Sequence, residues 1–139
     1  MDCDILTRVL VVSSDAGGTS TLIPVVQELL ERKAIVHILA SGPAVKVWEQ
    51  AGTTATWESV DDEISESDAL GMIESLQPQS MVTGAGAYNL IEHTFRRAAS
   101  TLNVLCTAVV DYWANYQKRF ERKLNGLTES SLPNLIGVM

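Results

Sequence analysis

Three short stretches of small and polar residues carry most of the chain's capacity for chemistry. They are SSDAGGTS (residues 13–20), TGAGAY (83–88) and DYWANY (111–116), and each follows an apolar run. In open α/β sheets, ligands collect at the carboxyl ends of the strands, beside the point where the strand order reverses. If the apolar runs are parallel strands, the three stretches meet at one edge of the sheet.

The first stretch offers backbone amides and hydroxyl groups. Its glycines let a ligand approach the backbone, and the free amides and dipole of a following helix favour an anion. The candidate ligand-binding residues here are Ser14, Asp15, Gly17, Gly18, Thr19 and Ser20. The alternative, that the glycines only allow a tight turn from strand to helix, remains equally open.

The second and third stretches add candidates of the same kind. Gly84 and Gly86 precede another helix, again either as ligand contacts or as a tight turn. Asp111 stands where a strand should end, a position at which α/β proteins often place a working carboxylate, and Asn115 follows it. Asp111 and Asp15 are therefore the candidate catalytic or anchoring carboxylates of the predicted site.

The aromatic residues and the histidines are weaker candidates. Trp113, Tyr116 and Phe120 could stack on a ligand, but their helical spacing favours burial against the sheet. His37 lies within a predicted buried strand, and His93 is expected on the exposed side of a helix. Neither has a serine or cysteine partner in sequence, so nucleophilic catalysis has no support.

Several specific binders are excluded by missing residues. The stretch DAGGTST lacks the third glycine of the dinucleotide fingerprint, and the second strand ends without an acid, which argues against NAD. No G-K-[ST] follows the glycines, so there is no P-loop. There is neither a G-x-S-x-G elbow nor a Cys/His cluster with metal spacing, so no metal site is expected.

The composition of the chain argues against further classes of function and location. The net charge of −7 argues against nucleic acid, which needs clustered Lys and Arg. No apolar run approaches the ~18 residues that span a bilayer. The N-terminus MDCDILTR has acids where a secretory signal carries positive charge, which predicts a cytoplasmic location. Cys106 lies in an apolar run and is expected to be a buried, reduced thiol.

The elements that must position these residues alternate along the chain. Apolar runs at 9–12, 34–40, 54–57, 80–83, 103–111 and 134–139 are predicted strands. Helical spacing predicts helices between them, in the regions 22–30, 42–52, 67–77 and 88–102. Alternation of this kind gives right-handed βαβ crossovers. The predicted fold is α/β: a Rossmann-like three-layer sandwich, with a mostly parallel sheet of five or six strands and helices on both faces.

Two local expectations depend on single residues. Pro24 lacks an amide hydrogen and should stand early in its helix, as it would with Thr21 as N-cap; an earlier start of the helix would imply a kink at Pro24. The acids Asp61, Asp62 and Glu63 are expected in a solvated loop before a helix capped by Ser65.

A family resemblance appears at the first motif. The segment VLVVSSDAGGTSTLIPVVQELLERKAIVHILASGPA (residues 9–44) resembles the opening of the N-terminal Rossmann-like domain of GT-B glycosyltransferases and of nucleotide-sugar 2-epimerases. The matching residues are Gly17, Gly18, Thr19, Pro24 and Leu29, followed by ERKAIVHILAS, and they cover about the first third of the chain. The family's RGH is RKA here, which leaves Asp15 as the candidate general base after the first strand.

The resemblance implies a function. In that family the N-terminal domain mainly faces the acceptor, and the C-terminal domain holds most nucleotide-sugar contacts. Residues 1–139 are accordingly expected to form a single Rossmann-like domain, the N-terminal half of a longer protein. The resemblance implies that this domain is part of a glycosyltransferase-like enzyme. It would bind a sugar or nucleotide-sugar-related ligand, and it would be inactive alone. Whether it forms homo-oligomers stays open.

Two alternatives remain. Ser14, Gly17 and Thr19 resemble the flavodoxin phosphate loop, and Trp57 and Tyr88 could flank a flavin ring, which would make the chain an FMN-binding protein. Ala16 breaks that pattern, because a hydroxyl residue is expected there. The other alternative is a non-catalytic interaction domain with no small-molecule ligand.

Overall fold

A parallel sheet forms the centre of the molecule. The computed structural model describes residues 7–86, 90–111 and 116–138. Within them the sheet strands are β1 (Arg8–Ser13), β2 (Ile35–Ala40), β3 (Thr56–Ser59), β4 (Ser80–Thr83), β5 (Leu105–Val110) and β8 (Leu135–Val138). Their order is β3-β2-β1-β4-β5-β8, and every neighbouring pair is parallel. The strand order therefore reverses between β1 and β4.

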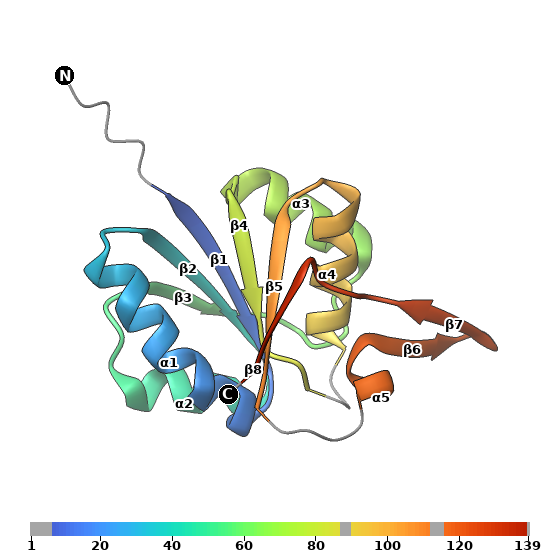
Figure 1. Cartoon of the computed structure of the whole chain (residues 1–139), viewed down its shortest axis with the longest axis horizontal. Helices are drawn as coiled ribbons and strands as arrows, with labels where there is room; N and C mark the ends of the chain where they lie inside the picture. The colour runs from blue at the N-terminus through green and yellow to red at the C-terminus, as the bar shows by residue number, and fades with distance from the viewer. Residues whose placement is uncertain (1–6, 87–89, 112–115, 139) are drawn as a thin grey trace.

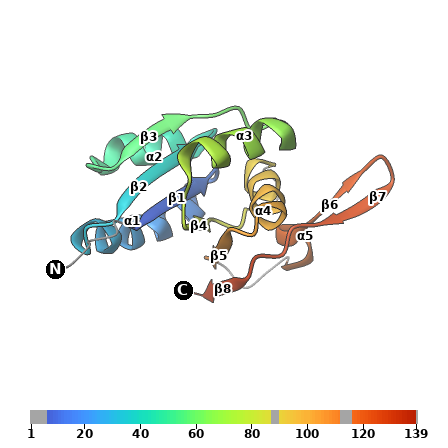
Figure 2. The same ribbon diagram turned by 90° about the horizontal axis from the view of Figure 1, so that it is seen from above.

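Helices cover both faces of this sheet (Figures 1 and 2). Val9 and Val11 of β1 pack in one core with α1 (Ala16–Glu31) and α2 (Pro43–Ala51). Leu10 and Val12 point to the other face and pack in a second core with α3 (Glu66–Leu76) and α4 (Ile91–Thr101). This alternation along a strand buried on both sides explains the continuous apolar runs. The predicted three-layer α/β sandwich is confirmed.

Helix α1 begins earlier than predicted. Its N-cap is Asp15, whose side chain accepts a hydrogen bond from the Gly18 amide, so Thr21 is not the cap. Pro24 lies inside the helix instead of in its first turn. The expectation from Pro24 was wrong because an aspartate is a strong N-cap, and it starts the helix directly after β1.

The first turn of α4 is the most deeply buried helical segment. Ile91, Glu92, His93 and Phe95 are each at most 2% exposed, so the expected exposure of His93 was wrong. Asp62 caps this helix from a distance, since its carboxylate accepts from the Leu90 and Ile91 amides at 3.2 Å. The loop before α3 is thus partly structural, whereas a solvated loop was expected.

The chain after β5 forms a hairpin that the sequence reading missed. The short helix α5 (Tyr116–Phe120) leads into β6 (Glu121–Leu124), which pairs antiparallel with β7 (Leu127–Ser130). Asn125 and Gly126 have φ angles of 52° and 78°, the left-handed values that a two-residue hairpin turn requires. The hairpin projects beyond α4 and α5 (Figure 1).

Other expectations about single residues are settled by burial. Cys106 is 2% exposed, and burial raises the pKa of its thiol to about 11, which confirms the inert core position. Phe120 is buried as expected, and the neighbouring Arg119 is buried as well. Trp113 and Tyr88 lie outside the described residues. No helix in the described part of the chain is long and apolar enough to span a bilayer.

Candidate functional site

The carboxyl ends of β1, β4 and β5 place the two candidate aspartates together. A Cβ atom built on Gly17 would lie 2.8 Å from Asp111 Oδ2 and 3.8 Å from Asp15 Oδ2. Gly17 is exposed and the Asp111 side chain is 22% exposed, so solvent reaches this group of residues. Residues nearly one hundred positions apart thus meet at the edge where the strand order reverses, as the parallel topology requires.

Asp15 occupies the helix N-terminus that was considered for an anion. Its Oδ2 accepts from the Gly18 amide at 3.1 Å, while its Oδ1 is buried without a hydrogen-bond partner among the described atoms. A Cβ atom on Gly18 would lie 2.6 Å from Oδ1, so the cap itself requires glycine there. The positive end of the helix dipole is therefore already balanced by a carboxylate of the protein.

Glu92, in the first turn of α4, is a site residue that sequence reasoning missed. It is fully buried, and its Oε1 accepts from the Ser14 hydroxyl at 3.0 Å and from the Gly86 amide at 2.9 Å. Its Oε2 has no hydrogen-bond partner among the described atoms and lies against Gly84, where a Cβ atom would collide with it. Glu92 joins the turns after β1 and β4.

Burial gives Glu92 an unusual proton affinity. Removal from water raises the pKa of its carboxyl from 4.5 to about 7, and the negative charge of Asp15 acts in the same direction. Arg96 and the Gly86 amide oppose the rise. Near neutral pH this side chain can hold or release a proton, which is the property required of a general acid or base.

Two buried arginines hold the second turn in place. Nη1 of Arg96 donates to Thr83 Oγ1 at 3.1 Å and to the Gly84 carbonyl at 3.0 Å, and its Nη2 donates to the Arg119 carbonyl at 2.7 Å. Nη1 of Arg119 donates to the Ala85 carbonyl at 2.6 Å and to Asp111 Oδ1 at 3.2 Å. These arginines tie α5 to the edge of the sheet.

Three buried polar atoms near this edge have no hydrogen-bond partner among the described atoms. Asp15 Oδ1 and Glu92 Oε2 are buried acceptors without partners, and Thr19 Oγ1 is a buried hydroxyl without one, among the described atoms. The arginine donors named above are directed to backbone carbonyls, to Thr83 and to Asp111. Because those unpartnered atoms are closed to solvent, the groups that solvent reaches at this edge are Gly17 and, in part, Asp111.

The remaining predicted residues divide into three groups. Ser14 and Gly86 contact Glu92, as described, and Thr19 is buried in the first turn of α1. Ser20 is exposed on α1 and its hydroxyl donates to the Ala16 carbonyl, which places no hydroxyl at the edge. Asn115 lies outside the described residues. Among the residues described, no three His, Cys, Asp or Glu side chains are grouped so that they could hold a metal ion.

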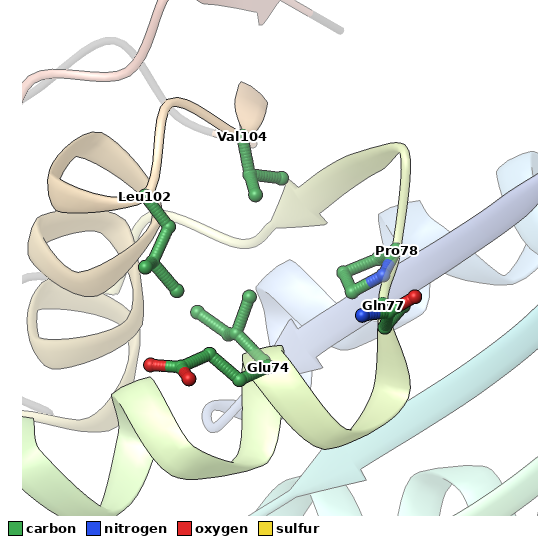
Figure 3. A pocket seen from close by; sticks show the side chains of 6 residues that line it. Glu74, Gln77, Pro78, Leu102 and Val104 are labelled. Atoms are coloured by element: carbon green, nitrogen blue, oxygen red, sulfur yellow. The ribbon is translucent and has the colours of Figure 1, made fainter.

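A surface pocket of about 430 Å³ lies at the opposite, amino edge of the sheet (Figure 3). Gln77 and Pro78 precede β4, Val104 precedes β5, and Glu74 and Leu102 complete its wall with Ile73. This pocket therefore lies away from the grouped polar residues, which are at the carboxyl edge.

Comparison with known proteins identifies the fold. No protein-family model matches the sequence, and no curated protein matches it. Among solved structures, MurG of Acinetobacter baumannii superposes with a TM-score of 0.65 at 12% identity, over 81% of this chain and 38% of that one. The UDP-GlcNAc 2-epimerase of Neisseria meningitidis, solved with UDP-GlcNAc bound, gives 0.59 at 12% identity, over 79% and 34%. The chain has a GT-B-like Rossmann fold.

The GT-B-like fold extends the predicted resemblance well beyond the first third of the chain. The resemblance in residues 9–44 is confirmed at the level of fold by these superpositions. The phenylacrylic acid decarboxylase of Aquifex aeolicus also superposes, with a TM-score of 0.57 at 16% identity, over 82% of this chain and 72% of that one. The chain spans little more than a third of the length of MurG and of the epimerase.

Proposed function

We propose that this chain is a GT-B-type ligand-binding domain that holds a sugar or nucleotide-sugar-related ligand at the carboxyl edge of β1, β4 and β5. The observation that carries the proposal is the convergence of Asp15 and Asp111 on Gly17 at the point of strand-order reversal. Open α/β sheets bind their ligands at this point. The epimerase with the same fold was solved with UDP-GlcNAc bound, which supports the class of ligand.

In this proposal the residues have distinct roles. Gly17 lets the ligand approach the first turn of α1, while Asp15 and Asp111 anchor hydroxyl groups. Arg119 orients Asp111 through the contact at 3.2 Å. Because MurG and the epimerase are more than twice as long as the superposed region, we propose that turnover needs a further domain. The 139-residue chain is then expected to bind ligand without converting it.

A thermal-shift experiment tests the proposal. The full chain is heated alone and with UDP-GlcNAc, UDP, N-acetylglucosamine or FMN. A ligand at a hundredfold excess over its Kd should add roughly 2.7 kcal/mol of stability. Asp111→Asn should weaken the binding of UDP-GlcNAc about tenfold, since a hydrogen bond to a charged carboxylate is replaced by a weaker one to a neutral amide. Glu49→Gln, an exposed change on α2, is the control of equal charge.

Two results would contradict the proposal. A stabilising effect of FMN alone would favour the flavodoxin-like alternative. No shift with any of the four compounds would favour a domain without a small-molecule ligand.

A further inference from the structure

We propose that two copies of this chain associate through the outer side of β8, the side that faces away from β5, with the two β8 strands antiparallel about a two-fold axis. The proposal does not depend on the proposed ligand. The observations that carry it are the position of β8 at the end of the sheet, the exposed apolar side chains on both of its faces, and the distribution of charge along the sheet.

Strand β8 has backbone groups that face no neighbouring strand. It pairs with β5 on one side, and in the described part of the chain no strand lies on its other side (Figure 2). Just before β8, the Asn134 amide donates to the Cys106 carbonyl of β5 at 2.9 Å. Because the backbone groups of successive residues in a strand point to opposite sides, those of Leu135 and Gly137 point outwards. Such a row of amides and carbonyls is a template for another strand.

The side chains of β8 are apolar and exposed on both faces of the sheet. Leu135 is 57% exposed on the face that α1 covers farther along the sheet, and Ile136 is 44% exposed on the opposite face. Leu105 of β5 is exposed on the same face as Leu135. Residues 130–139 carry no charge. Parallel sheets normally bury both faces, so β8 is an unusually apolar strand for an exposed position.

The other edge strand of the sheet is protected against such pairing. Like β8, β3 has four residues, but it contains Glu58, whose half-exposed carboxylate lies 2.7 Å from His37 Nε2. Thr56 and Ser59 of β3 are exposed and polar. A charged side chain on an edge strand opposes pairing with another chain. Of the two edge strands of this sheet, β8 is therefore the one that is open to a partner strand.

The distribution of charge favours a second copy of this chain as the partner. Residues 1–79 form β1, β2 and β3 and contain 13 acidic and 4 basic residues, whereas residues 80–139 form β4, β5 and β8 and contain 4 acidic and 6 basic residues. Strand β8 thus lies at the end of the sheet farthest from the acidic half. Two chains of net charge −7 that meet through β8 keep their acidic halves apart, which limits their repulsion. The β8 strand of a second copy is also uncharged and apolar on both faces.

A two-fold axis through Ile136 satisfies the outward backbone groups of both strands. It pairs Leu135 of each copy with Gly137 of the other, and these two residues exchange hydrogen bonds. The two Ile136 side chains then lie opposite each other on one face, as a cross-strand apolar pair. Both copies use the same surface, so the assembly closes at two chains.

Sedimentation equilibrium of the full chain over a hundredfold range of concentration tests the proposal. The wild type should change from monomer to dimer and no further. Ile136→Lys should weaken the dimer tenfold or more, because it places like charges opposite each other, and Leu135→Lys tests the opposite face in the same way. Leu127→Lys, at an exposed position of the hairpin, is the control and should leave the dimer unchanged. Circular dichroism of each variant shows whether the fold is kept.

Salt distinguishes this dimer from an association of the basic hairpin with the acidic half of another copy. Raising NaCl from about 0.1 M to about 1 M shortens the Debye length from about 10 Å to about 3 Å and should not weaken a dimer formed through β8. Dissociation at high salt would overturn the proposal. A wild type that stays monomeric at every concentration would also overturn it, and would leave β8 to a strand of another protein. Unchanged dimers in folded Ile136→Lys and Leu135→Lys would place the contact elsewhere and contradict it.

Discussion

The two glycine-bearing turns at the carboxyl edge are built on different principles. The turn after β1 is local: Asp15 caps the helix that begins at the next residue, and the Gly18 amide three positions later completes the cap. The turn after β4 depends on residues distant in sequence. Its backbone is held by Glu92 and Arg96 of α4, and Asp62 caps that helix. The two turns have similar sequences, but only the second depends on the tertiary fold for its shape.

This difference matters for function. A locally capped turn keeps its shape when its surroundings change, whereas a turn held by tertiary contacts changes with them. The carboxylate of Glu92 connects the two turns through Ser14 and Gly86. The following substitutions test the comparison, in order of decreasing expected effect.

Gly84→Ala should have the largest effect, because its Cβ atom would collide with Glu92 Oε2. Overpacking combined with the displacement of a hydrogen-bonded carboxylate should cost about 4 kcal/mol of unfolding free energy. Urea denaturation measures it. Gly71→Ala is the control, since nothing lies within 4 Å of a Cβ there, and the exposed helix position should gain roughly 0.5–1 kcal/mol. Equal effects of both variants would contradict the tertiary character of the second turn.

Glu92→Gln should change how stability depends on pH. The pKa of Glu92 is raised on folding, so its protonated form contributes stability that is fully present below pH 4.5 and lost as the pH rises through about 7. The unfolding free energy of the wild type relative to the variant should fall by about 3 kcal/mol between pH 4.5 and pH 8. Urea denaturation across this range measures the difference. A constant difference would show that Glu92 is not the buried titrating group.

Asp62→Ala should weaken the second turn from a distance. It removes the acceptor for the Leu90 and Ile91 amides and for the Ser41 hydroxyl. The expected cost is about 2 kcal/mol, at the upper end for a lost helix cap. Hydrogen exchange should speed up at the start of α4. Glu63→Ala, on the neighbouring exposed residue, should change neither quantity by more than about 0.5 kcal/mol.

Asp15→Ala should have the smallest effect on stability. The loss of a single N-cap hydrogen bond costs about 1 kcal/mol. Because this turn is local, the amides around Gly84 should keep their chemical shifts and exchange rates. If the signals of the second turn moved as far as those of the first, the two turns would be one cooperative unit and the comparison would fail.

Much of the fold was predictable because its signals are local. Four consecutive apolar residues at 9–12 indicate a strand buried on both faces, and the structure places them between two cores. The position of Asp111 at the end of β5 followed from the same pattern. The final strand was recognised in the residues that form β8, although its parallel pairing with β5 could only be assumed.

The missed features have specific causes. The pair Asn125-Gly126 between two short strands is a strong signal for a β-hairpin. The hairpin was not predicted because the aromatic residues before this pair suggested a continuing helix. Glu92 and Arg96 stand four residues apart, a spacing that usually indicates an exposed ion pair. Only the tertiary fold shows both side chains buried beneath the sheet edge. Glu92 does share a helix face with Phe95 and Ala99, and that was the signal available.

The most direct test of the ligand site is a titration of the ¹⁵N-labelled chain with UDP-GlcNAc, followed by amide chemical shifts. The account predicts that the largest changes occur at Gly17, Gly18, Gly84 and Gly86, at the carboxyl edge. Changes confined to Ile73, Gln77 and Val104, around the pocket at the amino edge (Figure 3), would contradict it.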